Sequence, residues 1–248
     1  MATMWSPWRG CKKFSSGCLH CYIHKGDAKR GIDTSNIVKT KQFDYPILKD
    51  KKGNYKMKSG LVYLCFSTDF LIEEADVWRS KAWEMIKERD DCHFLFLTKR
   101  ICRLKDCLPP DWNDGYDNVT ICCTIEDQES ADKRLSIFTA LPIKNRVITA
   151  QPLIEKIDIS KYLSNIQEVV VGGESDREAR VLDYSWVLSL REQCLKANVN
   201  FTFRQLGTHF LKDGNLYTLK TNILMSQARK ANIDIKIGGN NVVYSTYS

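Results

Sequence analysis

Short apolar runs alternate with longer amphipathic stretches along most of the chain. The runs are four to six residues long and rich in β-branched and aromatic side chains, which is typical of buried strands. They cover residues 61–66, 93–97, 119–124, 146–149, 168–171 and 200–203, with a weaker first strand at 3–5. Apolar residues at helical spacing predict helices over 73–89, 129–141 and 184–197.

The predicted strands recur at intervals of one strand–helix unit. Continuous apolar strands separated by helices indicate a parallel sheet covered by helices. We therefore expect an α/β fold, namely a complete or partial (β/α) barrel of the TIM type with six to seven parallel strands. A doubly wound open sheet is the alternative. The expected organisation is a single domain over residues 1–237 and a polar tail over 238–248.

A lysine-rich insertion at about 37–59 interrupts this rhythm. Gly53-Asn54 predicts a turn in its middle. The insertion is either a solvated hairpin or a basic surface for an anionic substrate. Tyr45 and Tyr55 lie among the lysines, and aromatic residues between cations suit a nucleotide or nucleic acid as substrate. The lysines are Lys39, Lys41, Lys49, Lys51, Lys52, Lys56 and Lys58.

Composition narrows the protein class. The 248 residues are 43% hydrophobic and 27% charged, which excludes a mainly disordered chain. No apolar run is long enough to span a membrane, and residues 1–10 lack the apolar core of a secretion signal, so we expect no membrane partner and a cytoplasmic location. The net charge of +7 permits a nucleic-acid partner without requiring one.

Three of the ten cysteines, Cys11, Cys18 and Cys21, follow the first predicted strand within eleven residues. Thiolates in such a loop select zinc or an iron–sulfur cluster, although simple packed thiols are a further reading. A structural zinc site needs four ligands, and His20 or His24 could be the fourth. A [4Fe-4S] cluster held by three cysteines keeps one iron open, and the absence of a later Cys-x-x-Cys pair favours this reading.

The cysteine loop resembles that of the radical S-adenosylmethionine superfamily. The whole chain is similar to an uncharacterised, phage-associated family of radical-SAM-like proteins, whose members open with Trp-x-Pro-x-x-Gly-Cys…Gly-Cys-x-x-Cys-Tyr. Here six residues separate Cys11 from Cys18, where the superfamily has three, and His20 replaces an aromatic residue. Further matching segments are Phe66-Ser-Thr-Asp69, Leu97-Thr-Lys-Arg100, Thr124-Ile-Glu-Asp-Gln128, Gln151-Pro-Leu153, Val171-Gly-Gly-Glu-Ser175 and Phe203-Arg-Gln-Leu-Gly207.

The resemblance implies an enzyme. A [4Fe-4S] cluster on the three cysteines would bind S-adenosyl-L-methionine and cleave it reductively, which starts radical chemistry on a substrate that the sequence does not identify. The electron would come from a donor such as flavodoxin or ferredoxin. In a (β/α) barrel the active site lies at the carboxyl ends of the strands, and in this sequence those ends are strongly polar.

Each strand-end candidate has a chemical reason. Asp69 suits the cofactor's ammonium group, and Lys99 or Arg100 suits its carboxylate. Thr124 or Glu126 suits the ribose hydroxyls, and Gly172-Gly173 suits close packing of the adenine. Capping of the following helix is the alternative role for Asp69.

Two other functions remain open. One is a zinc-binding structural or ligand-binding module with Cys11, Cys18, Cys21 and His24 as ligands. The other is a cluster-containing subunit that acts only with a partner protein.

Overall fold

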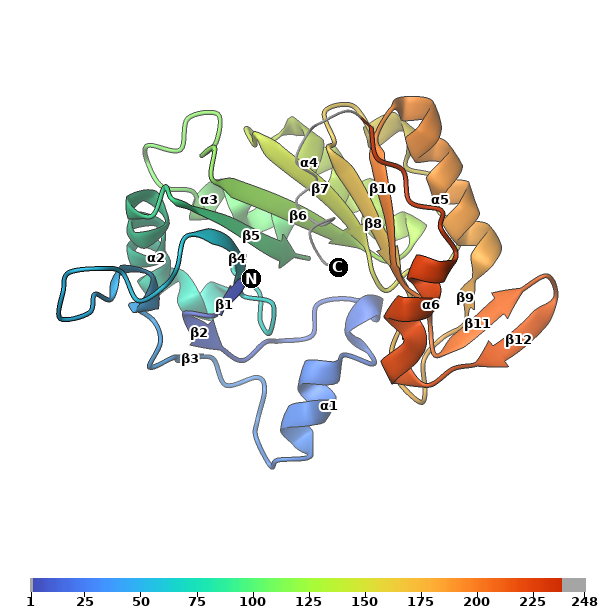
Figure 1. Ribbon diagram of the computed structural model, residues 1–248, viewed down its shortest axis with the longest axis horizontal. Coiled ribbons are helices and arrows are strands. Elements are labelled where there is room, and N and C mark those ends of the chain that lie inside the picture. The colour runs from blue at the N-terminus through green and yellow to red at the C-terminus, as the bar shows by residue number, and fades with distance from the viewer. Residues whose placement is uncertain (1, 238–248) are drawn as a thin grey trace. The chain divides into compact units, whose positions relative to one another are not determined.

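Every apolar run of the sequence forms a strand of a seven-stranded sheet (Figure 1). The computed structural model describes residues 2–237, so the tail predicted for 238–248 lies outside the described residues. β6 and β8 are buried at every residue, as expected of strands covered on both faces. The strands are β1 (Thr3–Trp5), β4 (Gly60–Leu64), β5 (Cys92–Thr98), β6 (Val119–Ile125), β7 (Asn145–Ala150), β8 (Glu168–Gly172) and β10 (Asn200–Gln205).

The strand order in this sheet follows the chain: β1-β4-β5-β6-β7-β8-β10. A doubly wound sheet would reverse its order at a switch point. The order of these seven strands has no such reversal over residues 2–237. The fold is therefore α/β with a seven-stranded parallel sheet, which is compatible with the expected partial (β/α) barrel.

The chain divides into two compact units. Unit 1 comprises Met1–Phe14, Ile23–Cys122 and Leu141–Asn145, and unit 2 comprises Ser15–Tyr22, Cys123–Ala140 and Arg146–Ser248. Within unit 1, β4 pairs in parallel with β1 and β5. Within unit 2, β8 pairs in parallel with β7 and β10. The single domain expected over 1–237 stays a prediction.

In unit 1 an aromatic cluster joins helix α2 (Asp76–Glu88) to the sheet. The ring of Trp83 lies edge-on to Phe70 and Phe96, with centroids 5.0 and 6.4 Å away. Val77, an apolar residue of α2, is nevertheless 79% exposed. The other helical elements of this part are α1 (Tyr22–Ala28), α3 (Leu104–Cys107), and the 3-10 turns Tyr45–Ile47, Glu73–Ala75 and Ile101–Arg103.

Unit 2 has two long helices close to their expected bounds, α4 (Gln128–Ala140) and α5 (Tyr184–Ala197). Asp183 begins α5 by accepting a hydrogen bond from Ser185 N, and Asn198 ends it with a φ of 57°. The sequence did not predict the small sheet of order β12-β11-β9. The remaining elements are β9 (Leu182–Asp183), β11 (His209–Lys212), β12 (Asn215–Thr218), α6 (Leu224–Lys230), and the 3-10 turns Ser16–Cys18, Ser160–Tyr162 and Thr221–Ile223.

The lysine-rich insertion is fastened to unit 1 by Arg89, whose side chain is fully buried. Arg89 donates hydrogen bonds to the carbonyl oxygens of Pro46 and of Met57, the latter at 2.9 Å. The turn predicted at Gly53-Asn54 is confirmed, with Gly53 at a φ of +84°. The insertion also contains β3 (Val38–Lys39), which pairs with β2 (Trp8–Arg9).

The helices of residues 2–237 include none with the length and apolar character that crossing a bilayer requires.

Candidate functional site

Solvent access separates the cysteines into three groups. Cys11, Cys18 and Cys21 are partly exposed, whereas six others are buried and Cys102 is exposed. Burial raises the pKa of Cys65 well above its usual range and that of Cys194 to about 12. Thiols with raised pKa values stay protonated and are poor metal ligands. The three cysteines of the motif therefore differ in solvent access from the six buried cysteines.

The backbone around Cys11 is held from two sides in unit 1. Gly10 has a φ of +94°, and a Cβ there would lie 2.5 Å from the carbonyl oxygen of Asn36. The Thr68 hydroxyl, just after β4, donates to the carbonyl oxygen of Gly10. Cys11 N donates to Thr34 O at 2.7 Å. The glycine before Cys11 is thus required by conformation and by space.

The carboxylate of Asp69 is engaged by donors from its own unit. Oδ1 accepts from Leu71 N at 2.9 Å and from the Thr98 hydroxyl at 2.9 Å. Oδ2 accepts from Lys99 N and from Arg100 Nη1, both at 3.2 Å. The structure therefore brings Asp69 and Lys99 together, but through the Lys99 backbone. The Asp69 side chain closes a turn to Leu71, and α2 begins only at Asp76.

Arg100 links this buried carboxylate to the cysteine loop. Its Nη1 pairs with Asp69, and its Nη2 donates to the carbonyl oxygen of Lys12 at 2.7 Å. Both side chains of the pair are less than a tenth exposed. Asp69 thereby positions the segment that carries Cys11, because it orients the guanidinium that holds the next residue.

Cys18 and Cys21 lie in a tight turn of unit 2. Cys18 ends a 3-10 turn, Ser16–Cys18, and Cys21 N donates to Cys18 O at 3.4 Å. The Ser16 hydroxyl donates to Asp127 Oδ2 at 2.9 Å. Arg180 Nη2 donates to Ser16 O at 3.0 Å. Asp127 follows β6 and Arg180 follows β8, so the ends of two strands brace this turn.

Glu174 anchors Arg180. The Glu174 side chain is 7% exposed. It accepts hydrogen bonds from Arg180 N at 2.7 Å and from Arg180 Nε at 3.2 Å, and Arg180 Nη2 makes a further contact with it. Gly173 permits this loop to form, because a Cβ there would lie 2.5 Å from Gly207 Cα. Gly172 O accepts from Leu153 N at 2.8 Å. The Gly172-Gly173-Glu174 segment is thus tightly packed against its own unit.

Thr124 and Glu126, expected near a ribose, share Arg134 as a partner. Glu126 has no exposed surface, and its two oxygens accept from Arg134 Nη1 at 2.8 Å and Nη2 at 3.1 Å. Arg134 Nη1 also donates to Thr124 O at 2.7 Å. The Glu126 carboxylate is therefore neutralised by a bidentate arginine.

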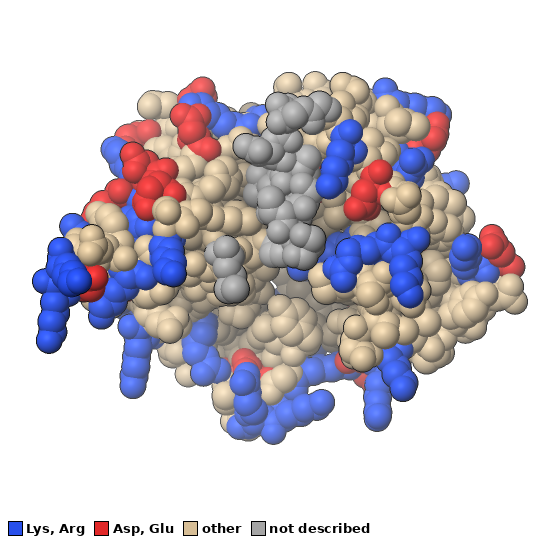
Figure 2. Space-filling model, viewed as in Figure 1, with Lys and Arg blue, Asp and Glu red and all other residues tan. Residues whose placement is uncertain are grey.

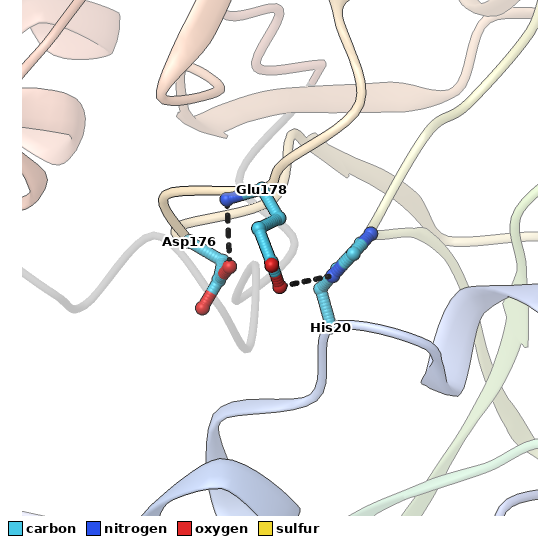
Figure 3. Close-up of side chains that lie close together, drawn as sticks. All are labelled: His20, Asp176 and Glu178. Carbon is cyan, nitrogen blue, oxygen red and sulfur yellow. Dashed lines mark hydrogen bonds and ion pairs between the residues drawn. The ribbon is translucent and has the colours of Figure 1, made fainter.

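His20 lies between Cys18 and Cys21 in sequence, and its ring faces two carboxylates. Its Nδ1 is 3.9 Å from Glu178 Oε2, and the nearest donor atoms of His20, Asp176 and Glu178 lie within 4.8 Å of one another (Figure 3). This carboxylate pair was not expected from the sequence.

Three thiols are a donor set of the chemical type that binds zinc or an iron–sulfur cluster. Three partly exposed thiols follow β1, the first strand of the parallel sheet. The Ser15 hydroxyl, in the same loop, is buried without a hydrogen-bond partner in the described part of the chain. A buried hydroxyl with no partner is costly, so a group bound beside it would supply the missing contact.

The lysines of the insertion are exposed, whereas its Tyr55 is packed against other side chains. Lysine side chains are exposed on the surface of this loop, at the left edge of Figure 2. The Tyr55 ring lies under Lys49 Nζ, 4.7 Å from the centroid, and under Arg89 at 4.3 Å. Its hydroxyl donates to Glu88 at 2.8 Å. Tyr55 already has cationic and hydrogen-bonding partners, so nucleobase stacking on it would require their displacement.

Sequence reasoning named Arg100 only as a partner for the cofactor's carboxylate, and it missed Arg134 and Arg180. Arg100, Arg134 and Arg180 each connect a buried carboxylate to backbone of the candidate site or of the strand beside it. The only signal in the sequence was their position shortly after a strand-end acid or lysine. Such spacing is common on solvated surfaces and does not identify a partner.

Comparison with known proteins gives a family. Neither the curated proteins nor the solved structures that were searched contain a match. One family model matches residues 1–241, and its description is "Protein of unknown function (DUF5131)". The match spans more than half of the chain, and the protein therefore belongs to the DUF5131 family.

Proposed function

We propose that the protein is an iron–sulfur enzyme of the radical S-adenosylmethionine type. Cys11, Cys18 and Cys21 would hold a [4Fe-4S] cluster whose open iron binds S-adenosyl-L-methionine. When bound, these groups would supply reductive cleavage of the cofactor and hydrogen abstraction from a substrate. The observation that carries the proposal is the contrast between three partly exposed thiols in one braced loop and six buried thiols elsewhere.

The role of the protein's own residues would be to fix the thiols before the cluster binds. Asp69 and Arg100 hold the Lys12 carbonyl, and Glu174 and Arg180 hold the Ser16 carbonyl. Preorganised ligands bind a metal more tightly because less conformational entropy is lost on binding. Both carboxylate–arginine pairs support the proposal, because each holds a carbonyl oxygen within two residues of a motif cysteine.

The cofactor pocket is proposed at the strand ends, with Asp69, Lys99, Thr124, Glu126, Gly172 and Gly173 near it. The carboxylates of Asp69 and Glu126 would act there mainly by orienting Arg100 and Arg134, since they already form ion pairs. Of the two basic residues expected to bind the cofactor's carboxylate, Lys99 and Arg100, Arg100 would present the positive charge. A flavodoxin or ferredoxin would serve as the electron donor.

The substrate is proposed to be a nucleotide or nucleic acid. The exposed lysines of the insertion support this, because several phosphate contacts are the main source of affinity for nucleic acids. The same lysines would attract anionic substrates of other classes, so the binding experiment compares DNA, RNA and mononucleotides.

The test of the cluster is anaerobic reconstitution followed by iron, sulfide and zinc analysis. We expect about four irons per chain in the wild type, the content of one [4Fe-4S] cluster. Replacing Cys11, Cys18 or Cys21 by alanine should abolish the cluster. Cys102→Ala and Cys107→Ala are matched controls, one exposed and one buried, and should retain it.

Two other outcomes would identify the alternatives. One zinc per chain without iron or sulfide would overturn the proposal and establish a zinc module. A full cluster that does not cleave added S-adenosyl-L-methionine after reduction would favour a subunit that needs a partner protein.

A further inference from the structure

A histidine and two carboxylates converge in unit 2 beside the turn that carries Cys18 and Cys21. His20 belongs to that turn, whereas Asp176 and Glu178 belong to the loop after β8. Figure 3 shows the Glu178 carboxylate pointing at the His20 ring, with Asp176 beside it. One donor atom from each of the three side chains lies within 4.8 Å of the other two. The donor set is therefore mixed, with one imidazole nitrogen and two carboxylate oxygens.

The spacing of these donors is wider than a direct hydrogen bond. His20 Nδ1 and Glu178 Oε2 are 3.9 Å apart, beyond the range of about 2.7–3.2 Å for N–H···O bonds. Two ligands that each lie about 2.1 Å from one ion are separated by about 3–4 Å. The distance between His20 and Glu178 thus matches ligands of a shared cation better than a hydrogen-bonded pair.

The loop holds the two carboxylates on the same side. Asp176 Oδ1 accepts from Glu178 N at 2.8 Å, and Asp176 O accepts from Ala179 N at 3.2 Å. Glu174, the other acid of this loop, is paired with Arg180. The His20 side chain is only 14% exposed, which limits its freedom to turn away.

We propose that His20, Asp176 and Glu178 bind one divalent cation of the Mn²⁺, Fe²⁺ or Zn²⁺ type. Imidazole and carboxylate together suit these first-row ions, whereas an all-oxygen site would be expected for Ca²⁺ or Mg²⁺. Three protein donors leave coordination positions for water or for an anionic oxygen of a substrate. Its proposed ligands include none of the three cysteines, and the proposal does not rest on the function proposed above.

The experiment uses Mn²⁺ alone as the probe, since it prefers oxygen and nitrogen ligands to thiolates. Binding is followed by the loss of the free Mn²⁺ electron paramagnetic resonance signal. It is measured in metal-free wild type and in a variant with Cys11, Cys18 and Cys21 all changed to alanine. We expect one Mn²⁺ per chain in both proteins, so that failure of the cluster proposal leaves this result unchanged.

Single variants then identify the ligands. His20→Ala and Glu178→Gln should each weaken Mn²⁺ binding at least tenfold, whereas His24→Ala, which changes the next histidine along the chain, should not change it. Glu178 is exposed, so Glu178→Gln should fold normally. The proposal would be overturned if wild type bound no Mn²⁺ up to millimolar concentration, or if wild type and both ligand variants bound it equally. His20 and Glu178 would then form only an ion pair.

Discussion

Arg180 connects the buried carboxylate of Glu174 to the carbonyl oxygen of Ser16, which it reaches from Nη2 at 3.0 Å. The contact joins residues 164 positions apart in sequence. It makes the loop after β8 a support for the turn that carries Cys18 and Cys21. The Gly-Gly-Glu segment of the sequence is therefore explained by its packing and by this arginine.

Arg180→Ala should loosen the cysteine turn. We expect Cys18 and Cys21 to react several-fold faster with a thiol reagent in the metal-free protein, because Ser16 O loses its donor. The free energy of unfolding should fall by about 2 kcal/mol, less than for a fully buried pair because Arg180 is partly exposed. Arg177→Ala, an exposed neighbour, is the control. Unchanged thiol reactivity in Arg180→Ala would contradict the bracing role.

Gly173→Ala should destabilise the protein although it adds only one methyl group. The new Cβ would lie 2.5 Å from Gly207 Cα and 2.6 Å from Gly207 N, so the backbone must shift. We expect a loss of about 1–3 kcal/mol in urea unfolding, the usual cost of overpacking. Gly26→Ala is the matched control, since nothing lies within 4 Å of its Cβ position in α1. That change should be neutral or stabilise by up to about 1 kcal/mol.

Arg89→Ala should release the lysine-rich insertion. The change leaves the carbonyl oxygens of Pro46 and Met57 without their donor in a buried region. We expect a loss of about 3 kcal/mol in the free energy of unfolding, together with trypsin cleavage after Lys51 or Lys52 at low protease concentration. Lys56→Ala, which keeps the Arg89 hydrogen bonds, should be cut as slowly as wild type. Equal cleavage of the Arg89 variant and wild type would show that other contacts hold the insertion.

Asp132 should titrate far below a normal aspartate. Hydrogen bonds from the Tyr162 hydroxyl, then Lys161 and Gln128, lower the pKa of Asp132 to about 2. Because the folded state favours the ionised form, this contribution to stability is present above the ordinary pKa of about 4 and is lost as the pH falls towards 2. Tyr162→Phe should raise the pKa of Asp132, as measured by carbon NMR of its carboxyl group. An unchanged pKa would exclude the tyrosine as the main cause.

Nucleic-acid binding should depend on the lysines of the insertion. If they contact phosphates, the logarithm of the binding constant should fall steeply with the logarithm of salt concentration. Changing Lys49, Lys51 and Lys52 to glutamine should flatten this slope by about 0.7–0.9 per lost phosphate contact. The control is the triple change of Lys81, Lys133 and Lys196, each paired with a glutamate on its own helix. Equal slopes for the two triple variants, or no binding of DNA, RNA or mononucleotides at low salt, would contradict the proposed substrate class.

The strands of the main sheet were predictable because burial on both faces leaves a continuous apolar run. Residues 119–124 were expected as a strand, and β6 spans Val119–Ile125 with every residue buried. The hairpin β11–β12 was missed for the opposite reason. All four residues of β12 are exposed, so no apolar pattern marks them.

The site was only partly predictable. The type and spacing of Cys11, Cys18 and Cys21 indicated a loop for metal ligands, and the structure leaves these thiols partly exposed. Strand-end acids were recognised but not their partners. Whether Glu126 faces a ligand or Arg134 depends on a contact that bridges from a strand end to a helix, and residue type alone does not distinguish the two.

The sequential strand order has a consequence for how the chain acquires its structure during synthesis. Most strands pair with the strand made just before them; Cys92, for example, pairs with Gly60, so the sheet can grow as the chain emerges. β1 differs because its partner strand is made much later: Thr3 pairs with Val62 of β4. The first strand must wait, unpaired, until the cysteine turn and the whole lysine-rich insertion have left the ribosome.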